Sequence, residues 1–124
     1  MSAIHERLQA ELAHRAADQI VSMSLCLDAL MIGLRNGVEL ELRFLDAEHY
    51  ALNWRWGELS LRVDTAPRHP EQTTYPQHWH DENDVVRADP WTQPGRSPED
   101  NALALIAALD RDPLLMAWRQ PAAG

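Results

Sequence analysis

Hydrophobic and polar residues alternate most regularly between residues 38 and 63, and this alternation predicts three antiparallel strands. Turn sequences separate them, with Asn36-Gly37 before the first strand and Gly57-Glu58 before the third. We expect Asn36-Gly37 to form a type I′ hairpin turn, because that turn needs positive φ angles at both central positions. The apolar residues of the strands are Val38, Leu40, Leu42, Phe44, Tyr50, Leu52, Trp54, Trp56, Leu59, Leu61 and Val63.

The loop lengths also predict which residues face each other across these strands. The expected pairs are Phe44 with Tyr50, Leu42 with Leu52, Leu40 with Trp54, and Trp54 with Leu61. This register puts every apolar side chain on one face of the sheet, and we assign Trp54 and Trp56 to the core. The outward face then carries Glu39, Glu41, Asn53, Arg55, Ser60 and Arg62.

The segment before the three strands predicts a helix followed by further strands. Residues 2–18 carry apolar side chains at i+4 spacing, and Ser2 can cap a helix there. Residues 20–35 fit either strands or a helix. We favour strands, because a helix would leave Val21, Leu25 and Ile32 exposed on its other side.

A second helix is predicted near the end of the chain. Ser97 is a suitable N-cap, Pro98 suits the first helical position, and Asp112-Pro113 ends the helix. The fold class is therefore α+β in one domain, 1–124. Its expected parts are an N-terminal helix (1–19), a curled antiparallel sheet of about four to five strands (20–65), a His/Pro-rich loop (66–97), a C-terminal helix (98–111) and a tail (112–124).

Composition narrows the class of protein. Hydrophobic residues make up 45% and charged residues 24%, as in soluble globular proteins. No apolar run approaches the roughly 18 residues of a membrane span, and no secretory signal is visible. The single cysteine, Cys26, suits the cytoplasm, and we expect it to be buried and inert. A formal net charge of -8 disfavours RNA unless a local cationic site or a partner helps.

Candidate chemistry gathers in the Pro-rich segment, where three histidines fall within twelve residues. His78 and His80 stand at i, i+2, so extended backbone points both rings the same way, and His69 joins them if the loop folds back. Such rings can act as general base and general acid in metal-independent RNA cleavage. The arginines available to stabilise the phosphorane are Arg55, Arg62 and Arg68.

Two other interpretations of these histidines stay open. His69, His78 and His80 could hold Zn²⁺ or another divalent metal, with Asp64, Glu71 or Asp81 as a carboxylate ligand. The segment could equally be a structural loop without a site. The other histidines of the chain, His5, His14 and His49, are expected at the surface.

The segment from Asp64 to His80 resembles the TumE-like toxins of bacterial toxin–antitoxin systems. It reads Asp-Thr-Ala-Pro-Arg-His-Pro-Glu and later Thr-Thr-Tyr-Pro-Gln-His-Trp-His. The family pattern is Asp-Asn-Ala-Pro-His-His-Pro-Glu, then Thr-x-x-Pro-His-His-x-His, so Arg68 and Gln77 replace histidines. The resemblance implies a toxin that halts growth, plausibly by attacking RNA, and a cognate antitoxin. We expect catalytic roles for His69, His78, His80, Arg68 and Asp64, and substrate binding by Arg55, Arg62 and Trp79.

The alternative to an enzyme is a non-catalytic interaction module. Here Trp79, Trp91 and Trp118 would be exposed anchors on a partner in a bacterial or phage assembly, or in a homo-oligomer. Metal analysis and a growth assay distinguish the three interpretations.

Overall fold

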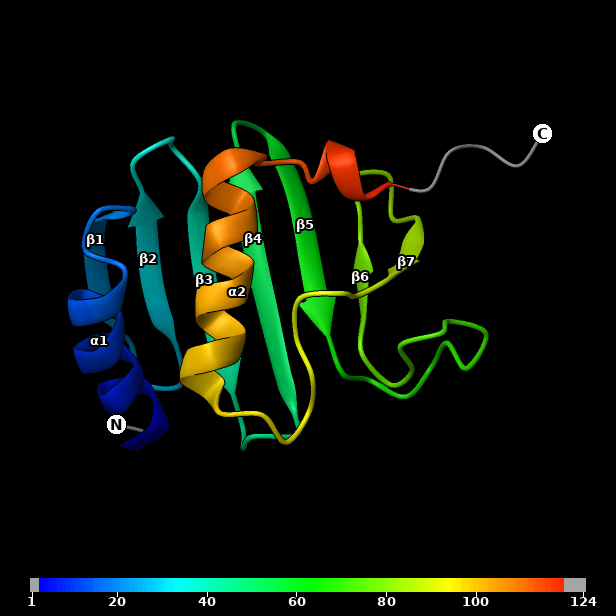
Figure 1. The fold of residues 1–124 in the computed structure, drawn as a ribbon, viewed down its shortest axis with the longest axis horizontal. Helices are drawn as coiled ribbons and strands as arrows, with labels where there is room; N and C mark the ends of the chain where they lie inside the picture. Colours follow the sequence, from blue (N-terminus) through cyan, green and yellow to red (C-terminus); the bar gives the residue numbers. More distant parts are fainter. Residues whose placement is uncertain (1–2, 120–124) are drawn as a thin grey trace.

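The computed structural model describes residues 3–119 as one seven-stranded antiparallel sheet with two helices on one face (Figure 1). The strands follow one another in chain order, β1 to β7. The elements are α1 (Ala3–Arg15), β1 (Ile20–Leu25), β2 (Leu30–Leu34), β3 (Glu39–Phe44), β4 (Tyr50–Trp56), β5 (Leu59–Asp64), β6 (His78–His80), β7 (Val86–Ala88), α2 (Pro98–Arg111) and the 3₁₀ turn η1 (Met116–Trp118). The predicted α+β class is confirmed.

The core lies between the sheet and the two helices. Every predicted pair of the central strands is observed, including Phe44 with Tyr50 and Trp54 with both Leu40 and Leu61. The inward residues of β3, β4 and β5 are therefore buried, except Trp56 and Leu59 beside the turn at Gly57. They pack against one face of each helix, which supplies Leu8, Leu12, Leu105, Ile106 and Leu109.

The turn before β3 differs from its prediction. Leu34 donates its backbone N–H to the carbonyl of Val38 at 2.9 Å, which closes a three-residue loop, 35–37. Gly37 has a φ of +94°, whereas Asn36 is not in the positive-φ region, so the predicted type I′ turn is wrong. The side chain of Asn36 instead donates to the carbonyl of Leu109 in the last turn of α2. The predicted turn at Gly57 is confirmed, since Trp56 and Leu59 pair across it.

The sheet is larger than predicted. Residues 20–35 form two strands as favoured, but β6 and β7 lie inside the segment 66–97 that we expected to be a loop. Each has three residues, too few for an alternating pattern to be visible. The first helix ends at Arg15 rather than near residue 18, while the second helix starts and stops as predicted.

Burial corrects five side-chain predictions. His5 is 2% exposed because its Nε2 accepts the buried N–H of Phe44. Cys26 is exposed in the β1–β2 turn. Trp79 and Trp91 are buried and stack edge to face, so neither is an exposed anchor. Two further tryptophans, Trp56 and Trp118, are 41% and 48% exposed, which places Trp56 at the rim of the core rather than inside it.

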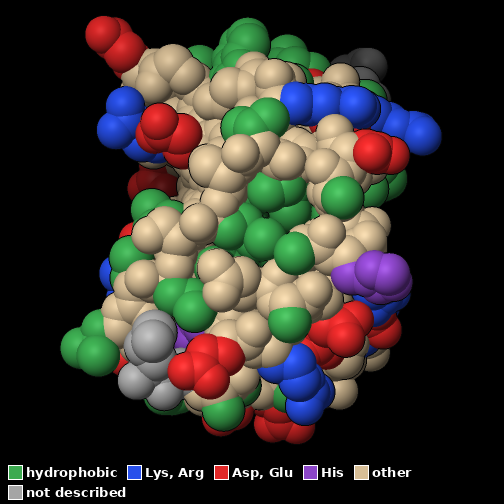
Figure 2. Space-filling view, turned by 90° about the vertical axis from the view of Figure 1, so that its left-hand side faces the viewer, with side chains coloured by type: hydrophobic (Ala, Val, Ile, Leu, Met, Phe, Trp, Pro, Cys, Tyr) green, Lys and Arg blue, Asp and Glu red, His purple; other side chains and the backbone are tan. Residues whose placement is uncertain are grey.

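Among the described residues, no strand pairs with the outer edge of β1. Hydrophobic side chains reach the surface among charged ones on this side of the molecule, as Figure 2 shows, and Val21 and Leu27 are 70% and 74% exposed. Within residues 3–119, neither helix has the length and apolar character that crossing a bilayer requires.

Candidate functional site

The three histidines of the Pro-rich segment meet on the face of the sheet that the helices leave open. The ring centroids of His69 and His78, and of His78 and His80, are 4.9 Å apart, and those of His69 and His80 are 5.9 Å apart. Trp79 points into the core between its two neighbours, so alternation along β6 turns both histidines outward. The loop before β6 folds back and adds His69, which is the condition that the sequence left open.

Each ring has its Nδ1 beside an oxygen that can only accept a hydrogen bond. These contacts are His69 with Glu71 Oε1 at 3.2 Å, His78 with the Pro76 carbonyl at 3.0 Å, and His80 with Asp84 Oδ1 at 2.8 Å. In the neutral forms of His69 and His80 the proton is therefore held on Nδ1, which fixes the tautomer and leaves Nε2 unprotonated. His78 differs, because the Asp64 carboxylate lies 3.0 Å from its Nε2 and both of its ring nitrogens therefore face acceptors.

Asp64 and Arg62 lie beside the rings on the neighbouring strand, β5. The register pairs Asp64 with His78 and Arg62 with His80. Asp64 Oδ1 lies 3.0 Å from His78 Nε2, and its Oδ2 lies 3.7 Å from His80 Nε2. Arg62 Nε forms an ion pair with Asp64 Oδ2 at 2.7 Å, and the backbone N–H of Ala66 donates to Oδ1. The carboxylate therefore connects both strand histidines to an arginine.

The surroundings of His80 favour its neutral form. Burial lowers the pKa of His80, and the nearby charges of Arg62 and His78 act in the same direction. The hydrogen bond that His80 donates to Asp84 and the charge of Asp64 oppose this shift without cancelling it. Arg62 Nη2 lies 3.2 Å from His80 Nε2 and is always a donor, so this nitrogen accepts.

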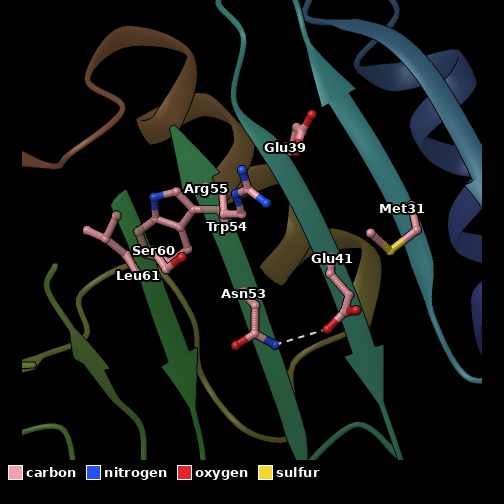
Figure 3. Close-up of a pocket in the computed structure, with 8 residues that line it drawn as sticks. All are labelled: Met31, Glu39, Glu41, Asn53, Trp54, Arg55, Ser60 and Leu61. Carbon is pink, nitrogen blue, oxygen red and sulfur yellow. Dashed lines mark hydrogen bonds between the residues drawn. The ribbon is translucent and has the colours of Figure 1, made fainter. Parts of the chain in front are cut away.

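The two arginines predicted to bind substrate also lie on the open face, along one depression. Arg62 and His80 line a hollow of about 200 Å³, and Arg55 lines a second hollow of about 350 Å³. The hollows share Asn53 and Ser60, so they adjoin each other. Figure 3 shows the second hollow, where Asn53 donates to Glu41 across β3 and β4.

The remaining predicted residues are placed differently. Arg68 is exposed next to His69, and its side chain has no hydrogen bond or ion pair within residues 3–119. Trp79 faces the core on the opposite side of the sheet, so we remove it from the substrate-binding residues. Asp84 is a site residue that the sequence did not reveal. Its position four residues after a histidine was the only signal, and its φ of +61° depends on the β6–β7 turn.

Comparison with known proteins gives one match. The family model described as Toxin TumE matches residues 10–112, which include the whole histidine cluster. No curated protein and no solved structure matches the chain. The resemblance seen in residues 64–80 is thereby confirmed and extends over most of the chain.

Proposed function

The chain belongs to the TumE toxin family, and we propose that it cleaves RNA at the cluster of His69, His78 and His80. Membership in a toxin family implies an antitoxin partner that holds the toxin inactive. The observation that carries the proposal is the position of His69 and His80. Their ring centroids lie 5.9 Å apart, each ring has its Nδ1 beside a carboxylate, and Arg62 contacts the Nε2 of His80.

This arrangement suits attack by the ribose 2′-hydroxyl on the adjacent phosphate. His80 is the general base, because Asp84 holds its Nδ1 proton and burial favours its neutral form. Its Nε2, which accepts from Arg62 in this structure, takes the hydroxyl proton once Arg62 turns to the phosphate. The 2′-oxygen then bonds to phosphorus while the bond to the 5′-oxygen breaks. His69 is the general acid that protonates this leaving oxygen; it is the most exposed ring of the three, and its Nδ1 lies 3.2 Å from Glu71 Oε1.

Arginines supply the positive charge that the reaction needs. Arg62 contacts His80 directly and Arg68 adjoins His69, so both can reach a phosphorane held between the two rings. Asp64 and His78 act as positioning residues, because Asp64 holds Arg62 and His78 in place. Arg55, at the other end of the depression, is suited to a flanking phosphate. With a net charge of -8, RNA binding has to rest on these local cations.

The test compares His80→Gln with His49→Gln, whose parent side chain is exposed and pairs with Asp46 outside the cluster. Each chain is induced in bacteria under tight control, then purified and given structured RNA. We expect wild type and His49→Gln to arrest growth and to leave 2′,3′-cyclic phosphate ends. His80→Gln should cleave about 10²- to 10⁴-fold more slowly, the usual contribution of a general base. Equal cleavage by all three would remove the cluster from the mechanism.

A further inference from the structure

We propose that His69, His78, His80 and Asp64 also form a binding site for Zn²⁺ or a transition-metal cation of similar chemistry. Metal-binding histidines almost always donate their second ring N–H to a carboxylate or a backbone carbonyl, which orients the ring and raises its basicity. All three rings of this cluster have such a partner at Nδ1. A cluster of surface histidines has no reason to repeat this arrangement three times.

The donor atoms converge on one point. One ring nitrogen from each histidine lies within 4.8 Å of the other two. Asp64 adds oxygens at 3.0 Å from His78 Nε2 and 3.7 Å from His80 Nε2. Four ligands placed about 2.0–2.2 Å from a tetrahedral Zn²⁺ stand about 3.4 Å from each other. The two Asp64 contacts lie on either side of this separation. The ring nitrogens, which lie within 4.8 Å of one another, have to approach each other by at most about 1.4 Å.

The donor types point to a particular class of cation. Three imidazoles and one carboxylate suit Zn²⁺, Cu²⁺ or Ni²⁺, whereas Mg²⁺ and Ca²⁺ prefer oxygen ligands throughout. The carboxylates of Glu71 and Asp84 add negative charge behind two of the rings. In this structure Arg62 lies against His80 Nε2, so its side chain has to move when a cation binds there. That side chain is 45% exposed and can turn into the solvent.

Metal binding at this site would stop the proposed cleavage. Four protein ligands complete a tetrahedral shell and leave no position for water, as in structural rather than catalytic zinc sites. The cation would also occupy the Nε2 atoms that the base, His80, and the acid, His69, need for proton transfer. This inhibitory consequence rests on the proposed function, whereas the existence of the site does not.

The binding test uses the whole chain after treatment with a chelator and dialysis. Co²⁺ is titrated first, because tetrahedral Co²⁺ absorbs visible light, and Zn²⁺ is then added to displace it. We expect one cation per chain, and loss of binding in His80→Gln. Asp84→Asn changes a side chain that is 85% exposed, so it should fold normally while losing about 10- to 100-fold in affinity. His49→Gln is the matched control and should bind like wild type.

RNA cleavage measured in EDTA and with increasing Zn²⁺ separates this inference from the proposed function. Binding of one cation per chain, with cleavage active in EDTA and inhibited by Zn²⁺, supports both. If one cation binds per chain and cleavage requires Zn²⁺, the metal site is retained. The proposals that four protein ligands close the site, that the cation inhibits cleavage and that cleavage needs no metal are then overturned. Absence of stoichiometric binding, or binding that His80→Gln does not change, overturns the site whether or not the chain cleaves RNA.

Discussion

His5 connects the first helix to the sheet, and its replacement by phenylalanine tests how the fold is held together. The side chain is 2% exposed, and its Nε2 accepts the backbone N–H of Phe44 at 3.1 Å. Burial lowers the pKa of His5 below its ordinary value of 6.5, so the folded chain keeps the ring neutral. Phenylalanine retains a ring of similar size but cannot accept the hydrogen bond.

The expected cost follows from the buried N–H of Phe44 that is left without a partner. A buried donor of this kind costs about 1–3 kcal/mol in free energy of unfolding. In a domain of this size, 1 kcal/mol lowers Tm by about 3–5 °C, so His5→Phe should melt about 5–10 °C below wild type near pH 7.5.

The same substitution should change the dependence of stability on pH. The unfolded chain binds a proton at His5 more readily than the folded chain does, because the folded pKa is lowered. The stability that the folded chain has with a neutral, buried His5 is therefore fully present above pH 6.5. It is lost as the pH falls toward the folded pKa, because the unfolded chain then takes up the proton. His5→Phe lacks this titration, so its stability should fall less than that of wild type between pH 7.5 and pH 5.5.

Urea unfolding at both pH values measures these effects. His14→Phe is the matched control, because His14 is exposed on the same helix. Its stability and pH profile should follow those of wild type. A His5→Phe chain as stable as wild type at pH 7.5, or one with the wild-type pH profile, would refute the role assigned to the Phe44 hydrogen bond.

Three further substitutions test other parts of the structure. Ser97→Ala removes the side-chain cap on the N–H of Asp100, and should cost about 1 kcal/mol in urea unfolding. Gly37→Ala places a side chain at a φ of +94°, and should lower the free energy of unfolding by about 1–2 kcal/mol without loss of RNA cleavage. Asp64→Asn weakens the hold on Arg62, and kinetic assays should show at least about 10-fold slower cleavage with Tm changed by only a few degrees.

The central strands could be predicted because their signals are local. Alternating side chains in β3, β4 and β5, together with Gly57 at a two-residue turn, were enough to give the observed register. The turn at Asn36 could not be predicted in the same way, because its side chain forms a long-range hydrogen bond with the carbonyl of Leu109 in α2. The local preference of Asn-Gly for a type I′ turn was outweighed by this hydrogen bond to Leu109, which is 73 residues away in the chain.

The site was predicted only in part, for a similar reason. The i, i+2 spacing of His78 and His80 was enough to place both rings on one face. Their Nδ1 partners were not predictable, since Asp84 and Pro76 reach the rings only through the turn and loop that surround a three-residue strand. The role of Asp64 was expected from the resemblance, and its contacts depend on the pairing of β5 with β6.

The burial of Trp79 explains why so short a strand can hold a reactive pair of rings. Trp79 pairs with Val63 in the core, stacks edge to face on Trp91 at 5.5 Å, and has the guanidinium of Arg87 5.6 Å from its ring centroid. Because neighbouring side chains in a strand point to opposite faces, a tryptophan fixed in the core also fixes the direction of the histidines on either side. In the sequence His-Trp-His, the geometry of the candidate site therefore depends on the packing of the core, although the tryptophan faces the opposite side of the sheet.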